Sequence, residues 1–592
     1  MGKERNVKGY LEKIKTVTNS KIGMALILNF SIYILLNIFF TPVLKSDDYY
    51  MSSMLYGIFS GEYDYHLVYS NVIIGVILKG LMNICPVVPW YTVFEMLLLF
   101  WAFTCLTYLC IKENPSKSTK LVLTAILLFF GYEGYIKITF TKTAAFLVAI
   151  GVYLCLKAVT DRQRAYAIFV QGMIFVIVGV LLRNAVLLMV LGIMAGIPFY
   201  QFVQRLIHRK KRTFKRTILL AYMLIFVFPV LFMVFASKLN AAVYAKDEGW
   251  NKYGYTNQLK AAIADHSTKD YAAKAEEYKK LGVSENDLDM IYQNQLYDPE
   301  FWNLKQQEKV ASLASDDYAY ADSSRMWDIS TIWKFFKVVP LRFFSYPYAG
   351  CLILMITLLL ILNYRKWFMA CLTLGLVVAE NYYMFVQARY LQNHVDVGII
   401  FSACLVILYV LIEELQKVKD MGRGIRFGIG MIGLAAALNS YSYYARTEFY
   451  DYGSEYACNE EYSSKAMEKY ANDKKHLYFT CSRETVYAEW VYGAYGIKER
   501  GYMDNVFSTG SGMLDSRKKV LKQYHVKSPM KEMVDSNVIR LLISDDLEGE
   551  VEKYQTYIRE HYCKNAKLEK IDEEASLNIY RCSSGREKKK GK

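Results

Sequence analysis

The adjacent acids Asp47 and Asp48 carry the strongest chemical signal in this sequence. They follow the first long apolar run, residues 22–40, by only a few positions. Neighbouring carboxylates repel each other, so one of them tends to keep its proton unless a cation joins the pair. Such a pair suits a general base, or a ligand for a divalent metal, for which Mg²⁺ and Mn²⁺ are the candidates. The tripeptide Ser-Asp-Asp recurs elsewhere in the chain, so position rather than composition singles out this copy.

Basic residues near the ends of other apolar runs are candidates to bind a phosphate group. Arg389 and His394 flank a predicted turn between two runs, and Arg183 separates two more. A guanidinium can grip two phosphate oxygens at once, and paired charges at membrane depth tend to be functional. Charged side chains near helix ends can instead extend to the lipid headgroups without any specific role, and this alternative stays open for all three residues. Lys142 is a further candidate, with pairing to Glu133 as its alternative.

The acid pair opens an elaborate loop, residues 45–90, that precedes the second apolar run. Residues 49–59 predict a short amphipathic helix, and residues 61–66 form a polar turn ending in His66, another candidate ligand for phosphate. The stretch 67–82 is apolar but carries polar side chains, so it is expected to lie in the membrane interface rather than to cross. A simple linker between two membrane spans would need neither helix.

The elements that must position these residues are mostly membrane helices. The chain has 592 residues, of which 54% are hydrophobic and 21% charged, whereas soluble proteins have roughly 45–50% and 25%. This composition excludes a disordered chain, and the irregular spacing of the cysteines excludes a disulfide scaffold. Apolar runs long enough to cross a bilayer occur about 11 times. The predicted spans are 22–40, 91–111, 121–138, 143–159, 165–182, 185–204, 217–236, 347–363, 367–386, 396–414 and 426–440.

Charge predicts how these spans are oriented. The formal net charge is +15, and basic residues concentrate in the loops that are cytoplasmic if the N-terminus is cytoplasmic. The positive charge is therefore a topology signal, and no nucleic-acid partner is expected. The sequence predicts a multi-pass cell-membrane protein. Its acid pair and two long polar segments, 237–346 and 441–592, are expected to be extracytoplasmic.

The segment 441–592 predicts a small extracytoplasmic α/β domain, because helical and strand patterns alternate along it. The expected elements are helices at 465–475, 516–524 and 550–563, strands at 476–481 and 538–544, and a hairpin of 568–572 with 577–582. The pairing of its four cysteines cannot be read from the sequence. The chain thus divides into an α-helical polytopic membrane domain, residues 1–440, and this domain. Helical patches are expected at 269–281 and 286–296 in the long loop between spans.

Three short motifs carry a resemblance to a known family. Ser46-Asp47-Asp48-Tyr49-Tyr50, Asp64-Tyr65-His66 and Pro89-Trp90-Tyr91, set around one span and its outer loop, resemble the GT-C class of membrane glycosyltransferases. Protein mannosyltransferases and aminoarabinose transferases belong to this class. The chain is similar to predicted GT-C-like proteins of Gram-positive surface-polysaccharide loci. The likeness covers the first ~90 residues by motif and the rest only by architecture.

The resemblance implies an inverting glycosyltransferase that uses a polyprenyl-phosphate sugar donor. The acceptor would be an extracytoplasmic glycan or a lipid-linked glycan in cell-surface polysaccharide synthesis. In the class, an acid of the first outer loop acts as the catalytic base or binds a metal, which here means Asp47 or Asp48. A carboxylate can take the acceptor proton, and cations such as Arg389, with Arg183 or His394, can stabilise the departing phosphate.

Three alternatives remain open at the level of sequence. A polysaccharide polymerase or ligase would move whole lipid-linked glycans instead of single sugars. A flippase or transporter would carry charges along the middle of its spans and show repeat symmetry, which the sequence does not display clearly. A scaffold of an assembly complex would not need the acid pair. The sugar, the acceptor, the linkage and the oligomeric state are not encoded in any motif.

Overall fold

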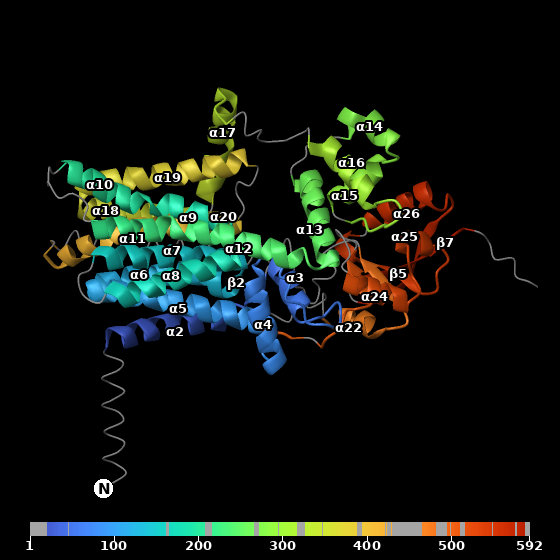
Figure 1. The fold of residues 1–592 in the computed structure, drawn as a ribbon, viewed down its shortest axis with the longest axis horizontal. Helices are drawn as coiled ribbons and strands as arrows, with labels where there is room; N and C mark the ends of the chain where they lie inside the picture. The colour runs from blue at the N-terminus through green and yellow to red at the C-terminus, as the bar shows by residue number, and fades with distance from the viewer. Residues whose placement is uncertain are drawn as a thin grey trace, which may run out of the picture.

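The chain folds into a bundle of long apolar helices and a separate domain of helices and strands, seen in the computed structural model (Figure 1). Arg389, Cys458, Cys481 and most of the predicted span 426–440 lie outside the described residues. The structure describes residues 20–44, 46–160, 165–207, 216–265, 271–293, 295–315, 326–345, 347–387, 393–420, 422, 428, 464–480, 494–497, 499–508, 515–547, 549–574 and 577–585.

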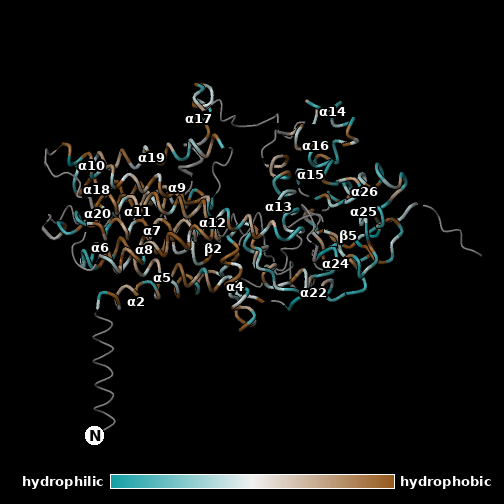
Figure 2. Tube along the Cα trace, in the orientation of Figure 1, coloured by the Kyte–Doolittle hydropathy of each residue, from teal (hydrophilic) through white to brown (hydrophobic). Residues whose placement is uncertain are grey.

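Eight helical stretches in the described residues are long and apolar enough to cross a membrane. Figure 2 shows the hydrophobic residues concentrated in these helices, whereas the separate domain is mainly hydrophilic. They are α2 (Lys21–Phe39), α5 (Trp90–Glu113), α6 with a π-helical turn (Lys117–Ile136), α7 (Phe140–Thr160), α9 with α10 (Val186–Ile207), α11 with α12 (Ile218–Tyr244), α19 with the turn before it (Tyr364–Val386) and α20 with the turn after it (Asn393–Val418).

The predicted number of spans is not confirmed. Two of the predicted runs form shorter apolar helices, Tyr166–Leu182 in α8 and Tyr348–Leu362 in α18. Their bounds, Ala165–Leu182 and Pro347–Leu362, match the predicted runs 165–182 and 347–363. At the helical rise of about 1.5 Å per residue, helices of this length lie at the lower limit of what crosses a bilayer core.

Local capping signals explain where several helices begin. The side chain of Ser20 accepts a hydrogen bond from the third residue of α2, and Ser116 does the same at the start of α6. Asn71 caps the first turn of α4 (Val72–Ile84). Each cap satisfies a backbone N–H group that has no partner within its helix.

Helices α7 and α20 form the centre of the bundle and are almost completely buried. Helix α7 packs closely on α8 (Ala165–Leu182) through facing glycines. A Cβ atom on Gly151 would lie 2.5 Å from the carbonyl oxygen of Gly172, and a Cβ on Gly172 would meet Gly151 at the same distance. Small residues that let two backbones touch are a common way to join helices in membranes.

Two short helices follow the first span, as the sequence predicts. Helix α3 (Ser46–Leu55) carries the acid pair in its first turn, and α4 runs across the direction of the long helices in Figure 1. Both lie at the end of the bundle where α2 finishes and where α5, α7 and α20 begin. This end is called the site end below.

The separate domain lies beyond the site end (Figure 1) and is built on a five-stranded sheet of order β4-β3-β5-β7-β6. Strands β3, β4 and β5 are parallel, and β7 and β6 form the antiparallel hairpin predicted from sequence. The sequence did not predict β4. The elements are α22 (Ser464–Asn472), β3 (Leu477–Thr480), β4 (Val506–Ser508), α24 (Asp515–Gln523), α25 (Pro529–Glu532), β5 (Ile539–Ser544), α26 (Glu550–His561), β6 (Lys567–Glu574) and β7 (Leu577–Ser583).

Part of the long loop between spans packs onto this sheet domain. The helices of this long loop are α13 (Glu248–Lys260), α14 (Ala275–Lys280), α15 (Glu285–Tyr292), α16 (Leu304–Ser315) and α17 (Ile329–Ser345). Ile291 and Val310 share one hydrophobic core with Tyr554 and Tyr557 of α26. The hydroxyl of Tyr557 also donates to the Asp298 carboxylate at 2.7 Å. This part of the loop and the C-terminal domain therefore share one hydrophobic core.

Candidate functional site

A short parallel strand pair brings the acid pair onto the central helix α7. Strand β1 (Val43–Leu44) pairs with β2 (Lys137–Ile138), with Val43 opposite Lys137. Because β1 lies just before α3 and β2 lies just before α7, the first turns of the two helices are brought together. The acids therefore stand at the site end, against the most deeply buried helices of the bundle.

The two acids occupy different environments. Asp48 is 1% exposed, and its Oδ1 atom accepts a hydrogen bond from the hydroxyl of Tyr91 at 2.9 Å and another from the backbone N–H of Phe140 at 2.7 Å. Asp47 is only partly buried. One acid is therefore held inside the protein, and the other is half-buried.

Glu95, which the sequence did not single out, is the third member of the acid group. It is buried in the first turns of α5, it lies within hydrogen-bonding reach of Asp48, and it accepts a hydrogen bond from Thr143 at 2.7 Å. Burial, followed by the negative charge of Glu95, raises the pKa of Asp48 well above its usual value. Two neighbouring carboxyls in a buried site repel each other, which favours a proton on one of them. An acid inside an apolar run was the available signal.

Lys142 forms a buried ion pair with Glu133, as one of the two alternatives from sequence predicted. The Nζ atom lies 2.7 Å from a carboxylate oxygen of Glu133, and neither side chain reaches solvent. Glu133 belongs to a π-helical turn, Tyr132–Ile136, at the end of α6. Such turns are rare and occur often at functional sites.

Acidic and basic side chains are buried together around the first turn of α7. They are Asp48, Glu95, Glu133, Lys137 and Lys142. A buried charge without a partner is costly, so these groups are expected to compensate one another.

Replacing Asp48 with Asn is therefore expected to reduce the pH dependence of stability. A carboxyl with a raised native pKa stabilises the fold at low pH, because the unfolded chain loses this proton from about pH 4 while the native state keeps it. That stabilisation declines as the pH rises, by up to about 1.4 kcal/mol per pH unit. An Asn side chain cannot ionise, yet it retains the accepting oxygen and supplies an N–H donor. Melting temperatures measured from acidic to neutral pH test this, and parallel curves for the two proteins would contradict it.

Arg183 lies beside the same residue that anchors Asp48. Its guanidinium is 5.3 Å from the ring centre of Phe140 and 5.6 Å from that of Tyr69. The loop after α3 is tied to this point, because Ser70 donates to the carbonyl of Leu182 at 2.9 Å. The structure thus brings Arg183, Asp48 and Lys142 together around the first turn of α7.

His66 belongs to a neighbouring aromatic cluster. Its Nδ1 atom lies 2.7 Å from Asp64, its ring stacks on Trp250 at 4.8 Å, and Trp250 donates to Asp64 at 3.1 Å. Burial alone would raise the pKa of Asp64, but the hydrogen bonds from His66 and Trp250 lower it. The His66 ring is buried, and its contacts with Asp64 and Trp250 attach the loop to α13. Its role as a ligand for phosphate stays a prediction.

His394 is partly buried in the first turn of α20, which also starts at the site end. A Cβ atom on Gly398 would lie 2.8 Å from the Cβ of Ala145, so the start of α20 lies about one turn from Lys142 on α7. The sequence prediction that joined His394 to the acid pair is thus compatible with the helix packing. Arg389 lies outside the described residues, and its role stays a prediction.

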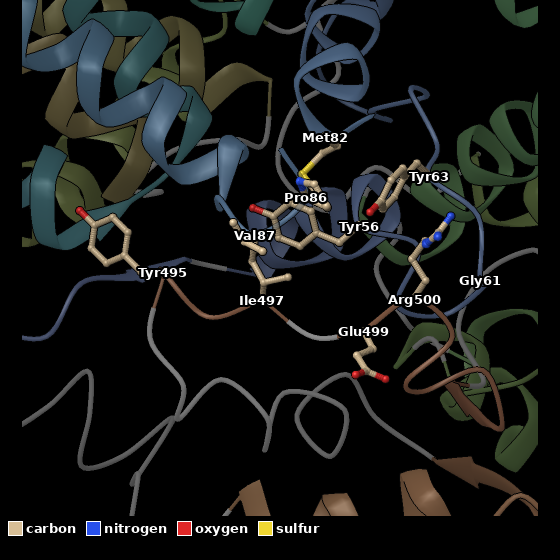
Figure 3. A pocket seen from close by; sticks show the side chains of 10 residues that line it. All are labelled: Tyr56, Gly61, Tyr63, Met82, Pro86, Val87, Tyr495, Ile497, Glu499 and Arg500. Carbon is tan, nitrogen blue, oxygen red and sulfur yellow. The ribbon is translucent and has the colours of Figure 1, made fainter. Parts of the chain in front are cut away.

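A cavity of about 920 Å³ opens between the loop after α3, the end of α4 and a segment of the sheet domain (Figure 3). Tyrosine rings and one arginine dominate its wall, and Arg500 lies 4.9 Å from the ring centre of Tyr63. Figure 3 shows the Tyr56 ring beside Pro86 and Val87 at the centre of the cavity. The lining residues are Tyr56, Gly61, Tyr63, Met82, Pro86, Val87, Tyr495, Ile497, Glu499 and Arg500.

Tyr56 connects this cavity with the carboxyl pair. Its side chain is almost completely buried, although it forms part of the cavity wall. Burial raises the pKa of the Tyr56 phenol, and the nearby Glu95 carboxyl adds to the rise. Tyr56 therefore lies between the cavity and the acid group.

The sheet domain is joined to the loop after α3 by backbone hydrogen bonds. The N–H of Gly501 donates to Gly57 at 2.9 Å, and the N–H of Met503 donates to Ile58 at 3.0 Å. Arg517 donates to the carbonyl of Phe59 and lies 3.8 Å from the ring centre of Phe507. Burial lowers the pKa of Arg517 to about 10. The wall of the cavity formed by residues 495–500 is thus held in place.

The Oδ1 atom of Asp48 already accepts two hydrogen bonds, which leaves Oδ2 as its atom for a metal. A metal held by Asp47 and Asp48 stays a prediction. Within the described ranges, the side chains close enough to hold a metal together are Asp287, Glu560 and His561, between α15 and α26. Asp287 already caps α15 and accepts from His561 at 3.0 Å. No reaction step is therefore assigned to a metal.

No family model, curated protein or solved structure matches this chain.

Proposed function

We propose that this chain is a membrane glycosyltransferase of the GT-C type. It would transfer a sugar from a polyprenyl-phosphate donor to an extracytoplasmic glycan or a lipid-linked acceptor in cell-surface polysaccharide synthesis. The observation that carries this proposal is the acid group at the end of a membrane-type helix bundle, in which the half-buried Asp47 stands beside the buried acids Asp48 and Glu95. With the orientation expected from the loop charges, the site end faces outward.

The proposed reaction needs one base and one group that stabilises the leaving phosphate. The carboxylate of Asp47 takes the proton of the acceptor hydroxyl as its oxygen bonds to the anomeric carbon of the sugar. The bond from that carbon to the phosphate oxygen breaks on the opposite face, and the phosphate leaves with the electron pair. Asp48 and Glu95 position α3 and stay out of the proton transfer.

Among the basic residues that the structure describes, Arg183 is the best suited to bind the phosphate. Lys142 is fully buried and paired with Glu133, whereas Arg183 is partly exposed beside Phe140. An arginine can donate two parallel hydrogen bonds to phosphate oxygens. Arg389 and His394 remain proposed helpers, because the sequence puts them near the same helix end.

The cavity is the proposed acceptor site. Tyr56, Tyr63 and Tyr495 offer aromatic faces on which the apolar faces of sugars can pack, and Arg500 offers charge-assisted hydrogen bonds to hydroxyl or acidic groups. Its volume is near the upper end of the range of small-molecule sites. That size also favours the alternative of a polymerase or ligase. Whether single sugars or whole repeat units reach the product discriminates between the two.

The test of the function is complementation in a strain that lacks this chain. The strain should lose a surface glycan, and the wild-type chain should restore it. The double variant Asp47→Asn/Asp48→Asn, at an equal level in the membrane, should not. A normal glycan made with the double variant would overturn the proposal.

Replacing Arg500 with Gln is expected to raise the acceptor KM by about 10-fold, corresponding to one lost charge-assisted hydrogen bond of about 1.4 kcal/mol. The kcat should change by less than about twofold, because Arg500 is not placed at the reacting atoms. Kinetics with purified chain and varied acceptor measure both. Lys279→Gln removes a similar charge from α14, away from the cavity, and is the control. An unchanged KM would remove Arg500 from the acceptor site.

A further inference from the structure

Helix α17 exposes large apolar side chains although it belongs to a polar segment of the sequence. Trp333 is 62% exposed, Ile329 is 85% exposed, and Trp327, just before the helix, is 81% exposed. Phe336 is exposed as well. A contiguous group of such residues on a water-facing surface is unusual and normally marks an interaction site.

The opposite face of α17 fixes the helix at the end of a membrane-type span. Phe335 is buried against Tyr382 and Phe385, with ring centres 5.1 and 5.7 Å apart, and both partners belong to the last turns of α19. The hydroxyl of Tyr382 donates to the carbonyl of Met326. Because α19 ends where α20 begins, α17 is held at the site end. In Figure 1 it projects across the direction of the long helices.

We propose that α17 rests on the membrane surface at the site end, with its exposed aromatic face in the lipid interface and its lysines on anionic headgroups. Trp side chains are enriched at the boundary between headgroups and acyl chains. Amphipathic helices lie there with their apolar face inserted and their basic residues at phosphate level. Lys334 and Lys337 supply that charge, and the Nζ atom of Lys337 lies 5.6 Å from the ring centre of Trp333.

The depth of α17 favours lipid over a protein partner. Its buried face touches the last turns of a helix that is long and apolar enough to cross the bilayer. The exposed aromatic residues are therefore at the level where that helix leaves the hydrocarbon core. Helix α4, at the same end of the bundle, also runs across the long helices (Figure 1) and exposes Val76, Ile77 and Ile84. This inference does not depend on the proposed reaction.

Tryptophan quenching in nanodiscs tests the proposal on the full chain. The discs contain phosphatidylglycerol and a lipid brominated near the headgroup end of the acyl chain. The double variant Trp327→Phe/Trp333→Phe should lose part of the emission that the brominated lipid quenches. Trp302→Phe, which changes a residue of the core shared with the sheet domain, should leave the quenched part unchanged.

Two outcomes would overturn the proposal. If the double variant shows the same quenched emission as the wild type, the aromatic face of α17 does not meet lipid. If it instead changes the number of chains per disc without changing the quenching, the face contacts a second copy. A further variant, Lys334→Gln/Lys337→Gln, should remove the difference in tryptophan emission between anionic and neutral discs, and an unchanged difference would contradict the role of the lysines.

Discussion

Replacing Asp47 with Asn is expected to reduce sugar transfer by about 10²- to 10⁴-fold, the usual contribution of a general base. The side chain keeps its size, and Asp47 is only partly buried, so the melting temperature should stay close to that of the wild type. The loss should fall on kcat, because the base acts in the transition state rather than in binding. Initial rates with purified chain, a lipid-phosphate donor and acceptor glycan measure this.

The matched control is the neighbouring acid. Asp48→Asn should keep most of the activity, because Asp48 is not the proposed base and the amide oxygen can still accept from Tyr91 and Phe140. Asp48→Ala should lose both activity and stability, since each buried donor left without a partner costs about 1–3 kcal/mol. An active Asp47→Asn variant together with an inactive, folded Asp48→Asn variant would reverse the roles proposed for the two acids.

Replacing Gly75 with Ala is expected to destabilise the chain by about 3 kcal/mol or more. A Cβ atom on Gly75 would lie only 1.8 Å from the carbonyl oxygen of Tyr65 and 2.7 Å from its carbonyl carbon. These are backbone atoms, so the whole turn that carries Asp64 and His66 would have to move away from α4. The expected result is a lower melting temperature or a loss of protein from the membrane.

Gly80 of the same helix provides the control for this substitution. No atom lies within 4 Å of a Cβ built on Gly80. Gly80→Ala should therefore stabilise the helix by about 0.5–1 kcal/mol, through the smaller conformational freedom of alanine. Equal melting temperatures for Gly75→Ala and Gly80→Ala would show that the close approach of α4 to Tyr65 is not needed.

The pattern of apolar and polar residues was enough to predict most elements. Long apolar runs form helices such as α5, α7 and α20, because a helix pairs the backbone N–H and C=O groups within the segment itself. The alternation in the C-terminal segment predicted β5, α26 and the hairpin β6–β7 within a residue or two. These elements depend on local periodicity, which a single sequence displays directly.

Two fold predictions were not confirmed or were incomplete. The runs 165–182 and 347–363 form α8 and α18 with almost the predicted bounds, but these helices are short for a membrane span, so the count of about 11 spans is not confirmed. Strand β4 has only three residues and pairs with β3, so its partner rather than its own sequence makes it a strand. Hydrogen bonds to a neighbour leave no periodic signal in so short a segment.

By itself, the sequence determined the membrane-type helices, the α/β character of the C-terminal domain and the position of Asp47 and Asp48 directly after the first apolar run. Only the tertiary structure decided that Asp48 is buried and Asp47 half-buried, that Glu95 lies beside Asp48, and that Lys142 pairs with Glu133. The physical reason is that a run of apolar residues is a local property of the sequence. Burial and ion pairing instead depend on contacts between helices that are distant in sequence. The two-residue pairing of β1 with β2 brings the first turns of α3 and α7 together, and no local sequence pattern predicts this pairing.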